Sequence, residues 1–346
     1  MSNAIRLAFT MGDPAGIGPE ITARATRALA GLTRGGRAEF IVLGSGAALR
    51  EAEQRLGLPA ADTDGRAFYR LVDVGPIEPP VVTGKVSAAG GEWAYRAVSR
   101  AAAMVQAGEA DAIVTGPLSK EGLHLAGHPF EGHTELLAHL TGQRDAVMML
   151  AHEDMHVSHV TTHCALADVP RRITPERLRR VFGVTLDALR ALGIERPRVA
   201  VAGLNPHCGE GGILGKEDDE IVAPIVREFA DQGVIGPLPG DTIFIKLRAR
   251  QFDAVVAMFH DQGHIPVKLM GFKVDPATGR WNAISGVNIT LGLPILRTSV
   301  DHGTAYDIAG QGIANADSLV EAAQYAMKLV EGRRQAAAAG AHKAAA

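Results

Sequence analysis

The chain has 346 residues, 35 basic and 38 acidic side chains, a formal net charge of -3 and 47% hydrophobic residues. One hydrophobic core usually serves roughly 250 to 300 residues at most, so we expect two domains. The near-neutral charge, without a long Lys or Arg block, argues against a sequence-independent nucleic-acid binder and against a polybasic membrane protein. No window approaches the roughly 20 apolar residues that span a bilayer. Without a signal-peptide pattern, and with only two cysteines, we expect a cytoplasmic protein.

Short apolar runs alternate with amphipathic stretches along most of the chain, which is typical of parallel strands covered by helices. The sequence therefore predicts the α/β class. Strands are expected at residues 5–10, 38–44, 111–117, 146–151, 155–163, 198–206 and 253–260. Helices are expected at 91–108 and at 174–193, the second with Thr174 as its N-cap and Gly193 as its C-terminal stop. The Ala-rich tail, 334–346, predicts a disordered end without a function.

The first predicted strand leads into GDPAGIGPE, residues 12–20, which opens a helix. Its glycines and prolines indicate a tight turn whose backbone N–H groups could meet an anion. It could also be only a turn. The spacing differs from the G-x-G-x-x-G of a dinucleotide fingerprint, so the loop gives weak support for a standard Rossmann cofactor site.

Three histidines, His163, His207 and His260, each follow a separate predicted strand in a turn-rich segment. Ligands of open α/β sheets bind beyond the carboxyl ends of the strands. Three imidazoles there could bind a divalent metal and leave some of its coordination positions open. A single histidine of this kind would more often be a hydrogen-bonded structural residue. Three in the same topological position favour a metal site.

Two further metal arrangements are not expected. His152, His156, His159 and His163 have the spacing of one helix face, but alternating β-branched residues indicate a hairpin that would point them to different sides. Cys164 and Cys208 directly follow candidate ligands, and adjacent residues on a strand point to opposite faces. We therefore expect buried thiols there and no His/Cys zinc site.

Several polar residues could bind an anion. His133 and Thr134 lie in the first turn of a predicted helix, where the dipole favours negative charge, although Thr134 could instead be only an N-cap. Arg297 and Lys268 offer bidentate and point-charge recognition of phosphate or carboxylate, with Asn288 between them. Either charge could equally be a solvated surface group.

The segment 299–318 is too polar and glycine-rich to be explained by packing, and it carries His302, Gly303, Thr304 and Asp307 in one loop. HGTAYDIAGQGIAN resembles the NAD-binding loop of isocitrate and isopropylmalate dehydrogenases, which also lack the standard dinucleotide fingerprint.

A closer resemblance, up to about residue 330, is to the 4-hydroxythreonine-4-phosphate dehydrogenase (PdxA) family of vitamin B6 synthesis. GDPAGIGPE, TGPLSK, GHTELLA, LNPHCGEGG, MFHDQGHIPVK and VNITLGLPILRTSVDHGTA match its pattern in order. The resemblance implies a two-domain fold like that of isocitrate and isopropylmalate dehydrogenases, with mixed, mostly parallel sheets flanked by helices. We expect a NAD-binding domain at 1–128 plus 291–333, and a substrate, metal and dimerisation domain at 129–290.

The resemblance also implies roles for individual residues. It implies a divalent metal (Zn, Co, Mn, Ni or Mg) on His163, His207 and His260, and substrate contacts from His133, Thr134, Lys268, Asn288 and Arg297. It assigns catalysis to Asp241 and Lys268, and NAD or NADP binding to His302, Gly303, Thr304 and Asp307. The family forms homodimers with the active site at the subunit interface.

The implied reaction is the oxidation and decarboxylation of a phosphorylated 3-hydroxy acid, with 4-hydroxy-L-threonine 4-phosphate as the first expected substrate. The segment 273–286 is longer than usual in the family, and GHIPVK resembles a second branch that acts on 4-phospho-D-threonate or 4-phospho-D-erythronate. A relative that oxidises a cis-dihydrodiol fits less well. Alternatives from other classes are a phosphate acyltransferase of the same fold, which absence of NAD binding would favour, and a non-catalytic metal-binding protein.

Overall fold

The computed structural model describes residues 4–58, 68–143, 145–274, 276–277 and 281–344. The chain divides into two compact units. Unit 1 comprises Met1–Ala146, Ala283–Val287 and Leu293–Val330, and unit 2 comprises Val147–Asn282, Asn288–Gly292 and Glu331–Ala346. The first unit extends to Ala146, past the expected boundary at 128, because Leu136 and Leu137 pack into its core.

Unit 1 is a parallel sheet with helices, in the strand order β3-β2-β1-β4-β13. Its strands are β1 (Ile5–Thr10), β2 (Ala38–Gly44), β3 (Arg70–Asp73), β4 (Ala112–Thr115) and β13 (Arg297–Val300). Its helices are α1 (Gly18–Ala28), α2 (Ala30–Arg34), α3 (Gly46–Arg55), α4 (Ala88–Gln106), α5 (Lys120–Leu125) and α6 (His133–Thr141). The apolar face of α4 covers β1, β2 and β4, as the period of its alanines predicts.

Unit 2 has the strand order β12-β5-β6-β9-β7-β8. Its strands are β5 (Val147–His152), β6 (Met155–His159), β7 (Val199–Ala202), β8 (Val234–Leu238), β9 (Ala254–Ala257) and, from Asn288 onward, β12 (Val287–Leu291). Its α-helices are α7 (Val169–Arg172), α8 (Pro175–Ala191), α9 (Ala223–Glu228), α10 (Gly240–Arg248) and α11 (His260–Gly271). Short turns of 3-10 helix lie at Leu166–Asp168, Pro206–Gly209 and Ala230–Gln232, and a π-helical turn at Asp218–Val222.

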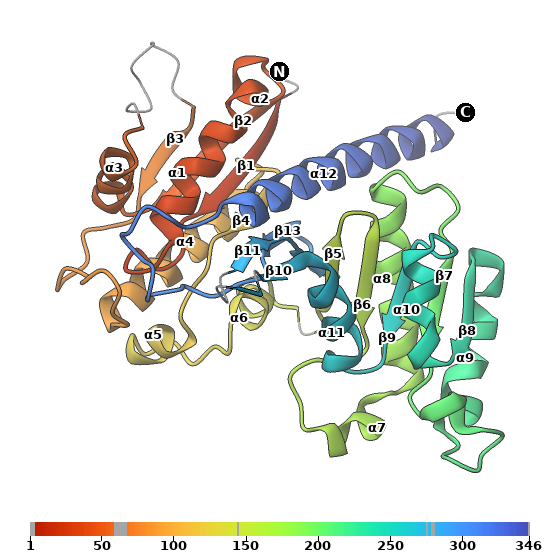
Figure 1. Ribbon diagram of the computed structural model, residues 1–346. Coiled ribbons are helices and arrows are strands. Elements are labelled where there is room, and N and C mark those ends of the chain that lie inside the picture. The colour runs from red at the N-terminus through yellow and green to blue at the C-terminus, as the bar shows by residue number, and fades with distance from the viewer. Residues whose placement is uncertain (1–3, 59–67, 144, 275, 278–280, 345–346) are drawn as a thin grey trace. The chain divides into compact units, whose positions relative to one another are not determined.

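The directions of the strands in unit 2 determine where in its sheet their carboxyl ends meet. Strands β6, β9, β7 and β8 are parallel, and β5 pairs with β6 in an antiparallel hairpin. Helix α8 packs against β5 and β6, and α10 packs against β7 and β9 (Figure 1). The predicted α/β class, with mostly parallel strands flanked by helices, is confirmed. Helix α8 begins at the predicted N-cap, where the Thr174 hydroxyl accepts from the Arg177 N–H, and Gly193 follows its end with φ +93°.

The C-terminal segment differs from the expected disordered tail. Helix α12 (Asp317–Ala344) continues through the Ala-rich sequence. Alanine has the highest helix propensity of all residues. A Cβ at Gly332 would lie 2.0 Å from the Ala191 carbonyl oxygen, so the glycine permits close contact with the end of α8.

In the long 273–286 segment, β10 (Phe272–Val274) and β11 (Trp281–Ile284) form a two-stranded sheet, whereas residues 275 and 278–280 lie outside the described part.

Among the helices described, none is long and apolar enough to cross a membrane.

Candidate active site

The candidate metal ligands follow three neighbouring parallel strands of unit 2. Strands β6, β9 and β7 lie in that order, so their carboxyl ends meet at one edge. His163 follows β6, His260 follows β9 as the first residue of α11, and His207 follows β7 in a 3-10 turn. The strands end a few residues earlier than predicted, but the topological position of all three histidines is the predicted one.

His163 and His260 are brought together. Their ring centroids lie 5.6 Å apart. Both line a cavity of about 360 Å³, together with Thr162, Cys164, Leu166, Val169, Phe259 and Asp261. The His260 Nδ1 is hydrogen-bonded to the Asp261 carboxylate at 2.7 Å. In metal sites a carboxylate on one ring nitrogen commonly orients the imidazole and leaves the other nitrogen for the ion.

His207 stands apart from this pair. Within the described part of the chain, the ligand atoms of His163, His207 and His260 do not all lie within 4.8 Å of one another. His207 is exposed and has a φ of 51°, a left-handed conformation that is uncommon for a non-glycine residue. The loop that carries it is firmly held, because the buried Asp218 carboxylate accepts from the backbone N–H groups of Leu204 and Asn205 at 2.7 and 2.9 Å.

Two other histidines pack behind the pair. His264 stacks on His260 with ring centroids 3.6 Å apart, and the centroid of His159 is 4.7 Å from that of His264. Burial lowers the pKa of His159 to about 3 and that of His264 to about 4, so both rings are neutral at neutral pH. The β5–β6 hairpin pairs His152 with Met155, which confirms that the histidines of this segment are not on one helix face.

The cysteines beside the candidate ligands are Cys164 and Cys208. Both are half-buried and form no disulfide, although the sequence predicted buried thiols. Burial raises the pKa of Cys208 to about 11, and the negative charges of Asp218, Asp219 and Asp241 add to this shift. A thiol with such a pKa is protonated at neutral pH in the metal-free protein. The same charge effect places Asp241, an exposed residue at the start of α10, close to the His207 loop.

Lys268 lies on the same face of α11 as His260 and His264, because the three residues are spaced by four. Its Nζ lies 5.5 Å from the centroid of the Phe272 ring. The helix thus carries a candidate ligand at its start and a lysine side chain two turns later. Asn288, at the start of the unit 2 part of β12, has a buried Oδ1 with no hydrogen-bond partner among the described residues.

Unit 1 contains a buried cationic group. Arg297, the first residue of β13, is 3% exposed, and its Nη2 and Nε donate to the Thr115 hydroxyl at 2.8 and 3.1 Å. Burial lowers the pKa of Arg297 to about 9, while the carboxylate of Glu135 opposes the shift. The guanidinium is therefore charged at neutral pH in a position where its hydration is lost. Such a group favours a bound anion.

Helix α6 begins next to this arginine. Its first residue is His133 and its N-cap is Gly132, which provides no side-chain cap, so Thr134 is not the N-cap. Burial, and then the charge of Arg297, hold the pKa of His133 well below its usual value. The buried His133 Nε2 has no partner among the described residues. A neutral imidazole and a helix start without a side-chain cap therefore lie near Arg297 in unit 1.

The expected cofactor loop, 302–315, docks on the loop that follows β1. The Ile17 N–H donates to the Thr304 carbonyl oxygen at 2.9 Å, and the Tyr306 hydroxyl donates to the buried Asp13 carboxylate at 2.6 Å. His302 is half-buried and its Nδ1 is hydrogen-bonded to the Gly303 carbonyl oxygen, whereas Gly303 and Asp307 are exposed. The four expected cofactor residues thus lie on a loop anchored to the first strand-to-helix turn.

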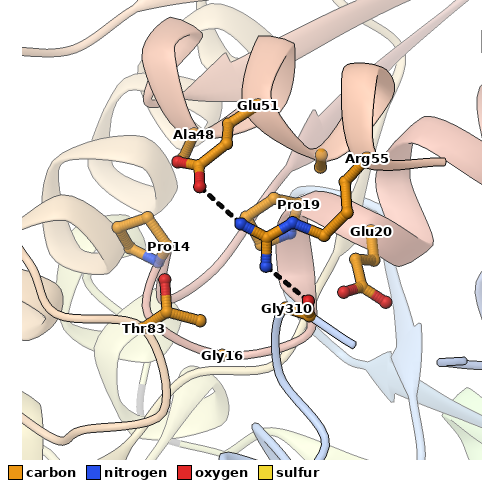
Figure 2. A pocket seen from close by; sticks show the side chains of 10 residues that line it. Pro14, Gly16, Pro19, Glu20, Ala48, Glu51, Arg55, Thr83 and Gly310 are labelled. Atoms are coloured by element: carbon orange, nitrogen blue, oxygen red, sulfur yellow. Dashed lines mark hydrogen bonds and ion pairs between the residues drawn. The ribbon is translucent and has the colours of Figure 1, made fainter. Parts of the chain in front are cut away.

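The far end of the loop is held by α1 and α3. Figure 2 shows the Arg55 guanidinium between the Glu51 carboxylate and the Gly310 carbonyl oxygen, and both contacts are hydrogen bonds. Glu20 accepts from the Gly312 N–H at 3.0 Å. The pocket between them measures about 30 Å³. These contacts anchor the loop.

Comparison with known proteins identifies the family. A family model described as "Pyridoxal phosphate biosynthetic protein PdxA" matches residues 37–326. The chain belongs to the PdxA family. The PdxA-family resemblance of the sequence motifs is thereby confirmed.

Relatives of this PdxA-family chain differ in their named substrates. "Putative D-threonate 4-phosphate dehydrogenase" of Bradyrhizobium diazoefficiens is 58% identical over 94% of this chain and 97% of its own length. D-threonate 4-phosphate dehydrogenase of Salmonella typhimurium is 42% identical over 93% of this chain and 98% of its own length. The crystal structure of 4-hydroxythreonine-4-phosphate dehydrogenase from Klebsiella pneumoniae matches with a TM-score of 0.77 and 40% identity. The match covers 94% of this chain and 99% of that one. A branched-chain phosphotransacylase from Enterococcus faecalis, 13% identical with a TM-score of 0.52, shares only the fold.

Sequence reasoning on this PdxA-family chain missed the residues that hold the site loops. Asp218 and Asp13 are completely buried carboxylates that bind backbone or hydroxyl groups. Asp218 lies in the run KEDDE, which reads as a solvated surface. The burial of Asp13 could have been predicted from the sequence, because this acidic residue lies between a glycine and a proline shortly after a buried strand.

Proposed function

We propose that this chain is a NAD(P)-dependent and divalent-metal-dependent dehydrogenase that oxidises and decarboxylates a phosphorylated 3-hydroxy acid. D-threonate 4-phosphate is the first candidate substrate, since the 58% identical relative carries that name. 4-Hydroxy-L-threonine 4-phosphate is the second, since the structure from Klebsiella pneumoniae carries that name. The two substrates differ at C2, which bears a hydroxyl group in the first and an ammonium group in the second.

The observation that carries the proposal is the pair His163 and His260 at the carboxyl edge of the unit 2 sheet. The two imidazoles face one cavity, and Asp261 orients one of them. This donor set fits a divalent ion. His207, on its held loop, is the proposed third ligand. A divalent cation bound there supplies Lewis-acid stabilisation of negative charge on the reacting oxygen, and NAD(P) accepts the hydride.

The chain's own residues have the following proposed roles. Arg297 binds the phosphate or carboxylate of the substrate, and the neutral His133 donates a hydrogen bond to the same anion. Thr134 and Asn288 orient the substrate. Lys268 or Asp241 takes the proton of the secondary hydroxyl as hydride leaves its carbon, which yields a 3-oxo acid. Loss of carbon dioxide from that acid leaves a carbanion at C2, and a proton returned there completes the reaction.

The cofactor is proposed to contact His302, Gly303, Thr304 and Asp307. The anchored loop supports this role, because a backbone that is held in place can orient a bound dinucleotide.

We further propose a homodimer with the active site at the subunit interface. Exposed His163 and His207, and the exposed apolar residues Ile265 (63%) and Leu269 (79%) on one face of α11, support a surface that a second copy covers.

The test is the rate of NADH formation by metal-supplemented protein with each of the two substrates. We expect a higher kcat/KM for D-threonate 4-phosphate, and dihydroxyacetone phosphate as its product. A preference for the amino acid would make 4-hydroxythreonine 4-phosphate the substrate. Absence of turnover on either, in protein that binds NADH and metal, would contradict the proposal.

A further inference from the structure

Gln262 makes two hydrogen bonds with different consequences. It is the third residue of α11, and its Oε1 accepts from the Met258 N–H at 2.7 Å. This bond resembles the return half of a capping box and is local to the helix start. Its Nε2 donates to the Gly203 carbonyl oxygen at 2.8 Å, across 59 residues of sequence.

The second bond joins two segments that carry candidate metal ligands. Met258 directly follows β9 and precedes His260, while Gly203 directly follows β7 and begins the loop of His207. The amide of Gln262 therefore connects the carboxyl ends of two adjacent parallel strands. The Gly203 N–H in turn donates to the Leu238 carbonyl oxygen of β8 at 2.8 Å, which extends the connection to a third strand.

The start of α10 packs against the same amide. A Cβ at Gly240 would lie 3.0 Å from the Gln262 Nε2, a tight contact, so the backbone at the start of α10 lies close to this amide. Asp241 is the next residue. One side chain thus contacts the segments of His207, His260 and Asp241, and it is not itself a ligand.

We propose that Gln262 is a positioning residue, which fixes the His207 loop and the start of α10 relative to His260. The inference rests on the proposed metal-dependent function. Only a side chain with both an acceptor and a donor at its end can make the two bonds. Glutamate at this position would keep the Met258 bond but turn a carboxylate oxygen toward the Gly203 carbonyl oxygen, which would repel it.

The test compares Gln262→Glu with Gln251→Glu, which makes the same change at an exposed position before β9. Zinc affinity is measured by competition with a chromophoric chelator, and the visible spectrum of the Co²⁺-loaded protein reports ligand geometry. We expect Gln262→Glu to weaken zinc binding at least about tenfold and to change the Co²⁺ spectrum, as loss of groups that orient ligands does. Gln251→Glu should leave both unchanged.

Two further variants separate the possible failures. His207→Ala should weaken zinc binding if this residue is a ligand. If it does and Gln262→Glu does not, the positioning role is wrong while the proposed function stands. If His207→Ala also has no effect, the proposed metal site is wrong and the role of Gln262 falls with it. Should Gln262→Glu fail to fold, Gln262→Met, which fills the same volume without the bonds, takes its place with the same expected loss.

Discussion

At the scale of single residues, the exposure of a charged group decides between a structural and a functional role. Arg297 could have been a solvated surface residue on sequence grounds. It is 3% exposed, and its pKa is lowered by burial, so the folded protein holds a charge that water would stabilise better. A residue that opposes stability in this way is expected to be kept for binding.

Arg297→Met is therefore expected to leave the free energy of unfolding of the substrate-free protein unchanged or to raise it, because a buried charge is removed. The same change should raise the KM for the phosphorylated substrate on the order of 100-fold, through loss of charge-assisted hydrogen bonds. Arg100→Met, at an exposed position on α4, should change neither quantity. Urea unfolding and steady-state kinetics measure the two. An unchanged KM would remove Arg297 from the substrate site.

At the scale of elements, one buried carboxylate organises the loop between β7 and α9. Asp218 accepts from two backbone N–H groups and from the Asn205 side chain. These bonds fix the chain just before His207, in a loop rich in glycine that has little other regular structure. The loop depends on this carboxylate more than on local propensity.

Asp218→Ala should lower the free energy of unfolding by roughly 2 to 4 kcal/mol, because two partly buried N–H groups lose their acceptor. The exposed neighbour Asp219 provides a matched control, and Asp219→Ala should change stability by less than about 0.5 kcal/mol. Thermal and urea unfolding of metal-free protein measure both. Equal stability of the two variants would show that the loop has other anchors.

At the scale of the whole molecule, unit 2 exposes two large apolar side chains on one of its helices. Ile265 and Leu269 lie one turn apart on the solvent side of α11, the helix that also carries His260 and Lys268. A second copy over this face would cover both residues and would lie close to the exposed candidate ligands. The proposed dimer and the proposed site would then be coupled.

Leu269→Asp should shift the protein toward the monomer and reduce kcat/KM with it, because a charge would be buried at the interface. Leu125→Asp, at an exposed apolar position on α5 in unit 1, is the control and should remain dimeric. Analytical ultracentrifugation over a range of protein concentrations distinguishes the two. A Leu269→Asp variant that stays dimeric would place the interface elsewhere.

Several local features could be predicted from the sequence because they depend on neighbours in the chain. The period of the apolar residues predicted α4 and α8, and the hydroxyl of Thr174 predicted the start of α8. The hairpin at 147–159 followed from alternating β-branched residues. The motifs also predicted the family and the three histidines after strands, since strand and turn residues are local signals.

The tertiary structure decided what depends on long-range pairing. Strand β9 lies between β6 and β7 although it follows both in the chain, and this order brings His163 beside His260. The burial of Arg297, the carboxylate of Asp218 and the bridge made by Gln262 also require contacts between residues far apart in sequence. The amino-acid sequence by itself determined which chemical groups are present and on which elements they lie. The packing of those elements determined which groups meet, because local periodicity carries no information about strand order.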